Sequence, residues 1–156
     1  MDKIDLYFEA IKQMVSEKDI KEVIDTGIQA RQNIVQLSGG NNDAITAAIL
    51  YSAIVGCCHD GGKMSKEEKE MVDVIAGPIV AALGQQAYDA IESVADEADY
   101  DVLRAFAQAG QEFGMSVLIL ILMFMYVDGK GSDKVLAKLK EIFQLNLLTA
   151  LSQEVK

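Results

Sequence analysis

Acidic side chains are the residues of this 156-residue chain whose placement suggests chemistry. Asp60 and Asp128 each stand where a strongly apolar segment gives way to a glycine-containing turn. Glu67, Glu68 and Asp133 follow, in what we predict to be the first turns of the next helices. Because carboxylate oxygens are the ligands that hard cations prefer, these five residues are the candidate metal ligands, with calcium the expected cation.

Turn and cap chemistry is a second explanation of the same acids. Aspartate is favoured in turns, and acids in the first turn of a helix interact favourably with the helix dipole. A calcium loop of the EF-hand type is not present: counted from Asp60, the third and fifth positions are Gly62 and Met64, whose side chains cannot ligate calcium. Without a specific motif, the residues favour caps and turns but leave cation binding open.

Other catalytic or metal chemistry finds little support. Residues 57–60 read Cys-Cys-His-Asp, but zinc motifs separate their ligands so that the side chains can converge. His59 is the only histidine, and no Gly-x-Ser-x-Gly elbow accompanies it. The chain also lacks the glycine-rich phosphate loop of nucleotide-binding proteins. We therefore expect a protein that is not an enzyme.

The charge of the chain restricts its partners. There are 14 lysines and arginines against 24 aspartates and glutamates, a net charge of −10, and the basic residues are interspersed with acids. Nucleic acids and anionic membranes attract basic faces, so neither is an expected partner. The electrostatic complements of this chain are cations and basic protein surfaces.

The most apolar segment is residues 115–127. At about 13 residues it is shorter than the roughly 20 that a transmembrane helix needs, so we expect a buried core helix and no membrane insertion.

No signal peptide is evident at the start of the chain. Adjacent Cys57 and Cys58 do not form a disulfide framework, which fits a reducing compartment. The expected location is the cytoplasm.

Helical periodicity dominates the chain, and Pro78 is the single proline. We predict an all-α protein, a bundle of about seven helices in one domain over residues 1–156. Asp19 is expected to cap the second helix, and Ser132 the last. Ser65 and Glu68 form the pattern of a capping box, in which each side chain bonds the other residue's backbone amide.

Two stretches of the chain share one pattern. Each has an apolar helix, an Asp-Gly pair, a lysine, a serine at the expected N-cap and then a charged amphipathic helix; they run through residues 54–65 and 123–132. The second loop is one residue shorter, and Val135 replaces the glutamate of the capping box. The simplest interpretation is two helix–loop–helix units whose apolar helices pack together at the centre of the bundle.

An alanine-rich helix followed by Asp-Gly and a Ser-x-x-Glu cap resembles the TerB-like, or tellurite-resistance protein B, family. Asp60 and residues 61–70 carry most of the likeness, which spans roughly residues 41–145 with the apolar helices included. The resemblance implies an all-helical fold of two related units, a role in resistance to tellurite and other stresses, and acidic residues that bind divalent cations. It also implies an unidentified, membrane-associated protein partner.

Two functions from different classes follow. The first is a TerB-like stress-response protein whose Asp60 and Asp128 loops bind a divalent cation and alter helix packing or a partner surface. The second is a metal-independent acidic helical module whose partner docks on an exposed helix face.

Overall fold

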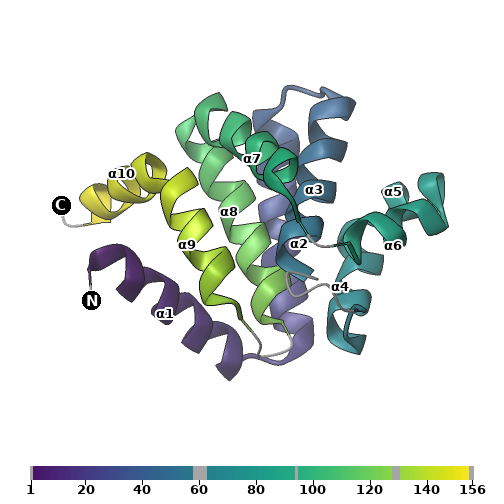
Figure 1. Ribbon diagram of the computed structural model, residues 1–156, viewed down its shortest axis with the longest axis horizontal. Coiled ribbons are helices and arrows are strands. Elements are labelled where there is room, and N and C mark those ends of the chain that lie inside the picture. Colours follow the sequence, from purple (N-terminus) through teal and green to yellow (C-terminus); the bar gives the residue numbers. More distant parts are fainter. Residues whose placement is uncertain (1, 58–62, 94, 128–130, 155–156) are drawn as a thin grey trace.

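The computed structural model describes residues 2–57, 63–93, 95–127 and 131–154, with side chains up to Ser152, and its described part is all-helical (Figure 1). In chain order the helices are α1 (Lys3–Glu17), α2 (Ile20–Leu37), α3 (Asn42–Cys57), α4 (Lys66–Ile75), α5 (Gly77–Leu83), α6 (Gln85–Ile91), α7 (Glu97–Ala109), α8 (Gln111–Tyr126), α9 (Asp133–Ile142) and α10 (Gln144–Glu154).

These ten helices in the described residues confirm the all-α class, but the predicted number of about seven is wrong. Short helices account for part of the difference. Pro78 opens α5 in its first turn, where its missing amide costs no helical hydrogen bond. Gly84 then separates α5 from α6 with a φ of 62°, a left-handed conformation that suits glycine.

Tertiary contacts account for the rest. The apolar stripe predicted a single last helix up to Leu151, but the helix is interrupted at Phe143, which separates α9 from α10. Just after the break, the side chain of Asn146 donates to the carbonyl oxygens of Ala107 (3.2 Å) and Gln111 (3.5 Å). Gln111 Nε2 in turn donates to the Asn146 carbonyl oxygen at 2.7 Å. These bonds hold the start of α10 at the junction of α7 and α8. The chain therefore changes direction after α9 and does not extend it as one helix.

The helix starts follow the predicted caps. Asp19 accepts a hydrogen bond from the Glu22 amide at 2.9 Å and so caps α2. Ser65 and Glu68 make both bonds of the capping box on α4. Ser132 caps α9, accepting from the Val135 amide at 3.3 Å. Each bond satisfies a backbone amide that the first helical turn leaves without a partner.

The core is built around α3 and α8, which make the most extensive helix–helix contact among the described residues. A Cβ atom placed on Gly56 of α3 would stand 2.7 Å from the carbonyl oxygen of Ile121 in α8, so the two backbones approach closely. Eleven residues of α8 are buried, from Gly114 to Tyr126. The apolar segment is thus the expected core helix, and it begins at Gln111 rather than after Gly114.

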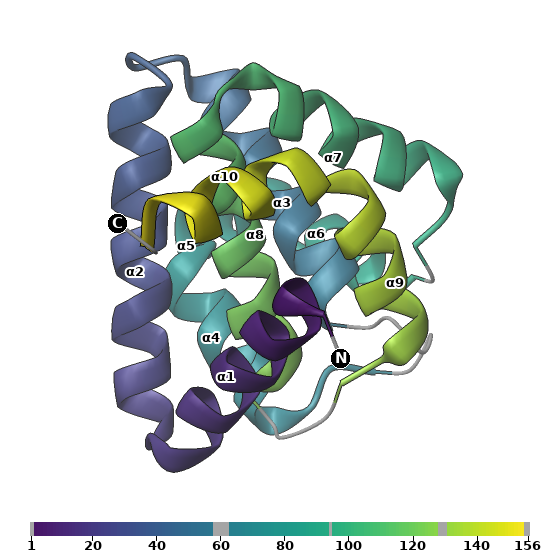
Figure 2. The ribbon, with the colours of Figure 1, turned by 90° about the vertical axis from the view of Figure 1, so that its left-hand side faces the viewer.

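The helices α3 and α8 run parallel (Figures 1 and 2). Gln36 and Leu37 at the end of α2 share a cleft with Glu112 and Met115 at the start of α8. Because α3 begins just beyond the turn that follows α2, α3 and α8 start at the same end of the molecule. The contact of Gly56 with Ile121 and Phe124 shows that their last turns also lie together.

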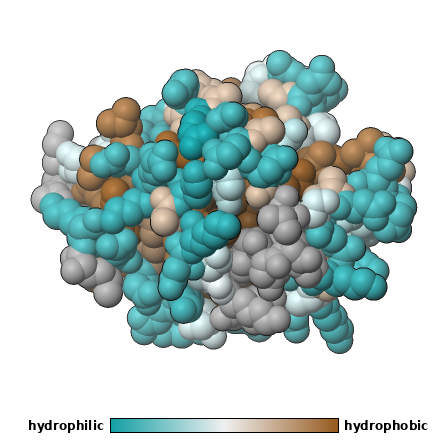
Figure 3. Space-filling model, in the orientation of Figure 1, coloured by the Kyte–Doolittle hydropathy of each residue, from teal (hydrophilic) through white to brown (hydrophobic). Residues whose placement is uncertain are grey.

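The remaining helices surround this pair (Figure 2). Helices α1, α2, α7 and α10 all contact α8; in Figure 2, α2 lies at the left, α7 at the upper right, and α1 and α10 in front, while α4 to α6 lie beyond α2 and α3. The face in Figure 3 is mostly hydrophilic, with hydrophobic surface over α10, where Leu145 is 80% exposed. Among the described residues, no helix is both long and apolar enough to cross a membrane.

Candidate functional site

The predicted metal ligands on α4 lie at its start. Glu68 is buried, and its Oε1 accepts from the Ser65 amide at 2.9 Å while the Glu68 amide donates to Ser65 Oγ at 3.1 Å. Glu67, in the same turn, is half-buried. Glu92, the residue after α6, also fixes this region, because its Oε2 accepts from the Met64 amide at 2.9 Å. The Glu68 carboxylate therefore has a structural function as a cap.

The predicted ligand on α9 lies elsewhere. Asp133 is exposed at the first position of α9, and it lines a cleft against α1. Asp60 and Asp128 lie outside the described residues. Within the described ranges, no three histidine, cysteine, aspartate or glutamate side chains gather closely enough to hold a metal ion. The structure thus does not bring Asp133 together with Glu67 and Glu68.

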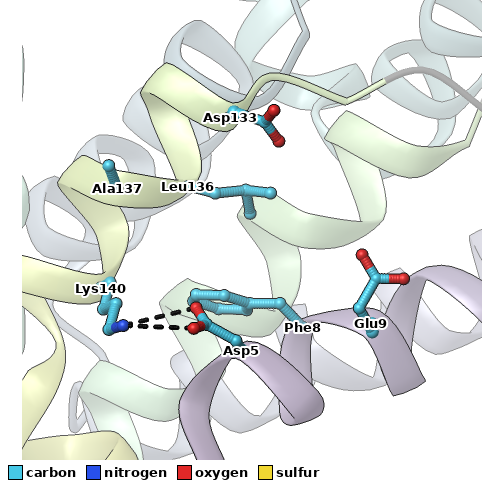
Figure 4. Close-up of a pocket in the computed structure, with 7 residues that line it drawn as sticks. All are labelled: Asp5, Phe8, Glu9, Asp133, Leu136, Ala137 and Lys140. Carbon is cyan, nitrogen blue, oxygen red and sulfur yellow. Dashed lines mark hydrogen bonds and ion pairs between the residues drawn. The ribbon is translucent and has the colours of Figure 1, made fainter. Parts of the chain in front are cut away.

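A cleft between α1 and α9 is the feature that the sequence analysis did not identify (Figure 4). We call it the α1–α9 cleft. Its larger lobe has a volume of about 370 Å³ and is lined by Asp5, Phe8, Glu9, Asp133, Leu136, Ala137 and Lys140. A second lobe of about 270 Å³ shares three of these residues and is lined by Glu9, Lys12, Tyr126, Gly131, Ser132, Asp133 and Leu136.

One end of the cleft is closed by an ion-pair cluster. Lys140 Nζ lies 2.5 Å from Asp2 Oδ2 and 3.4 Å from Asp5 Oδ1, so α9 is tied to the first residues of α1. The hydrogen bond from Lys140 lowers the pKa of the Asp2 carboxyl, and the same bond raises the pKa of Lys140. Figure 4 shows the Lys140–Asp5 ion pair at the side of the cleft away from Glu9, with Phe8 and Leu136 between them.

The other end of the cleft holds two carboxylates and a phenol. Glu9 and Asp133 are exposed there, and neither makes an ion pair with another described residue. Tyr126, at the end of α8, is only 3% exposed. Burial raises its pKa to about 12, with smaller contributions from the charges of Glu9 and Asp133. This end of the cleft combines a buried phenol with two exposed carboxylates, and Lys12 also lines it.

Nothing in the sequence identified α1 as part of a site. Its pattern of Ile4, Phe8, Ile11 and Val15 is that of an ordinary amphipathic helix. The signal that marks the cleft is an ion pair between Lys140 and Asp2, which are separated by almost the whole chain. Such a contact depends on where α1 packs in the fold, and the periodicity of the sequence does not predict that position.

In comparisons with known proteins, no family model, no curated protein and no solved structure matches this chain.

Proposed function

We propose that this chain is a non-enzymatic, TerB-like protein of a cytoplasmic tellurite or stress response that binds a divalent cation, with calcium first among the candidates. In this proposal α3 with α4 and α8 with α9 are two related units. Each unit supplies acids from the loop after its apolar helix and from the first turn of the helix that follows. The ligands proposed are Asp60, Glu67, Glu68, Asp128 and Asp133.

The parallel packing of α3 and α8 is the observation that supports the proposal best. Because Gly56 contacts Ile121 and Phe124, the last turns of the two helices are adjacent. Asp60 follows the end of α3 by three residues and Asp128 follows the end of α8 by two. Two acids that leave neighbouring helix ends can approach one ion, as calcium with its six to eight oxygen ligands requires.

The position of Glu68 suggests how cation binding would alter the helix packing. Its carboxylate caps α4 through the Ser65 amide. A cation that attracted this carboxylate would compete with the capping bond and alter the start of α4. Cation binding would then change how α4 packs against α2 and α3. A partner protein that recognises this packing would respond to the cation.

The experiment is an amide-resolved NMR titration of the chelator-treated full chain with calcium. We expect saturable shifts that centre on residues 60–68 and 128–135. The double substitution Asp60→Asn and Asp128→Asn should abolish them. A matched control, Asp25→Asn with Asp43→Asn, makes the same change of charge at two exposed acids elsewhere and should leave them intact.

Two outcomes would contradict the cation proposal. One is the absence of any saturable shift at millimolar calcium. The other is an undiminished calcium affinity in the Asp60→Asn and Asp128→Asn variant, since the shifts would then report a different site. Magnesium, manganese and zinc, titrated in the same way, establish which ion is preferred.

A second candidate function is the metal-independent acidic interaction module. The α1–α9 cleft favours it, because Glu9 and Asp133 present carboxylates there without an ion-pair partner among the described residues. The two functions differ in their response to a chelator. A partner that binds equally with and without chelator supports the module, and a partner lost in chelator supports the cation-responsive protein.

A further inference from the structure

The α1–α9 cleft combines an apolar middle with an acidic end. Its middle is lined by Phe8 of α1 and Leu136 of α9, which face each other across the cleft (Figure 4). Beyond them, Glu9 and Asp133 bring two carboxylates to the second lobe. The larger lobe, at about 370 Å³, lies within the size range of ligand pockets, roughly 300–1,000 Å³.

Tyr126 supplies an observation that is independent of the acids. Its side chain is 97% buried, and its hydroxyl makes no hydrogen bond to another described residue. Gly131 covers the ring, since a Cβ atom there would stand 2.9 Å from Tyr126 Cε1. Among the described residues, every fully buried side-chain oxygen has a partner, so the Tyr126 hydroxyl is reached from the second lobe that it lines. A hydroxyl without a hydrogen-bond partner among the described residues thus belongs to a side chain that lines the cleft.

The charges around the cleft favour a cation. Asp2, Asp5, Glu9 and Asp133 carry four negative charges, of which Lys140 engages the first two. Lys12 also lines the second lobe, but it is exposed and makes no ion pair with a described residue. Glu9 and Asp133 therefore remain available to a cation from outside, in a chain whose net charge is −10.

We propose that the α1–α9 cleft is the docking site for an arginine side chain of a basic peptide segment in a partner protein. The methylene stem lies between Phe8 and Leu136, as long cationic side chains bury their stems along apolar surface. The guanidinium reaches Glu9, Asp133 and the Tyr126 oxygen. Arginine fits because its planar head presents five donors in a fixed geometry to several acceptors at once, which lysine cannot do.

This site does not depend on the cation-binding proposal. Asp133 is common to both, but Glu9, Tyr126 and Phe8 belong to the cleft alone, and Asp60 and Asp128 belong to the proposed cation site alone. The experiments therefore use Glu9 and Tyr126 for the cleft and are carried out in chelator. The Asp60→Asn and Asp128→Asn variant should bind the peptide as the unchanged chain does.

The test is an NMR titration of the full chain with the peptide acetyl-Gly-Arg-Gly-amide. Acetyl-Gly-citrulline-Gly-amide, in which a neutral urea replaces the guanidinium at nearly the same shape, is the matched control. We expect saturable shifts in α1 and α9 with the arginine peptide. The citrulline peptide should bind at least tenfold more weakly, because hydrogen bonds to charged groups are the stronger ones.

Variants of the protein provide the second arm. Glu9→Gln should weaken binding of the arginine peptide roughly tenfold, and Tyr126→Phe severalfold, while Glu17→Gln, an exposed acid further along α1, should change it less than twofold. Lys12→Gln should strengthen binding, because it removes a competing cation from the lobe. Circular dichroism melts test whether Tyr126→Phe, the one change at a buried residue, remains folded.

Three results would overturn the proposal. The first is equal binding of the arginine and citrulline peptides. The second is no saturable shift in α1 or α9 at about 20 mM peptide, since even a millimolar dissociation constant would give near-saturation there. The third is arginine binding that Glu9→Gln leaves unchanged. In each case a calcium response that depends on Asp60 and Asp128 would leave the cation proposal standing.

Discussion

Gly56 of α3 lies against the backbone of α8 at Ile121, so closely that a Cβ atom on Gly56 would stand 2.7 Å from the Ile121 carbonyl oxygen. Phe124 Cβ would lie at the same distance. A glycine within a helix ordinarily costs about 1 kcal/mol relative to alanine. At this position the absence of a Cβ atom permits a close approach of the two central helices.

We expect Gly56→Ala to destabilise the protein by about 1–3 kcal/mol, because the added methyl group must push two helix backbones apart. Gly27→Ala is the matched control. There the added atom meets the ends of the Ile75 and Met71 side chains, which can move, so its effect should be small or stabilising. Urea unfolding followed by circular dichroism measures both. If the two changes have the same effect, the backbone contact does not limit the packing of α3 on α8.

Asn146 should be the most sensitive residue of α10. It is 5% exposed, and its side chain donates to carbonyl oxygens at the junction of α7 and α8. Asn146→Ala leaves these carbonyls without that donor, so we expect a loss of about 1–3 kcal/mol in unfolding free energy. Leu145→Ala changes the neighbouring residue, which is 80% exposed, and should cost less than about 0.5 kcal/mol. Similar losses in both variants would mean that α10 is held by its apolar contacts instead.

The two serine caps should differ in strength. Ser65→Ala removes a cap that is part of a reciprocal pair with Glu68, whereas Ser132→Ala removes a single hydrogen bond to Val135. A lost serine cap costs about 1 kcal/mol, with a range of about 0.5–2 kcal/mol. We expect Ser65→Ala in the upper half of this range and Ser132→Ala in the lower half, as measured by thermal and urea unfolding. The reverse order would show that the reciprocal bond adds nothing.

Tyr126 should make stability depend on pH above neutrality. Its pKa in the folded protein is about 12, against the ordinary 10.0, so between these values the folded state retains a proton that the unfolded state has lost. Stability therefore falls as pH rises through this window. The loss is on the order of 2 kcal/mol. Tyr126→Phe removes this contribution, so its unfolding free energy should decline less between pH 9 and 11.5 than that of the unchanged chain. Equal declines would show that the phenol ionises as readily in the folded state as in the unfolded one.

Local features of the fold could be predicted from the sequence, because their causes lie within a few residues. Asp19, Ser65 and Ser132 were recognised as caps from the residues that follow them, and all three make the expected bonds. The apolar run after residue 115 was recognised as a core helix because it was too short to span a membrane. Each cap is explained within one helical turn, and the core helix within its own apolar run.

The break between α9 and α10 could not be predicted in this way. No glycine or proline marks it, and the apolar stripe continues through Phe143 and Leu147. Its explanation lies in Asn146, whose partners Ala107 and Gln111 are more than 30 residues away. The α1–α9 cleft could not be predicted for the same reason, because Lys140 and Asp2 come together only when α1 lies beside α9 in the folded protein. The acids of the proposed cation site were chosen by type and spacing, and that choice remains a prediction.

The central position of α8 has a consequence for how the protein is made. Helices α1, α2, α3, α4 and α7 all pack on α8, yet α8 follows more than 100 residues of chain. During synthesis the apolar faces of α2 and α3 therefore emerge from the ribosome long before the helix that covers them. Such exposed apolar surface is prone to aggregation until its partner arrives. A chain that ends at Ala109 should accordingly show no cooperative thermal transition and should bind chaperones, whereas the full chain, which contains α8, should show one.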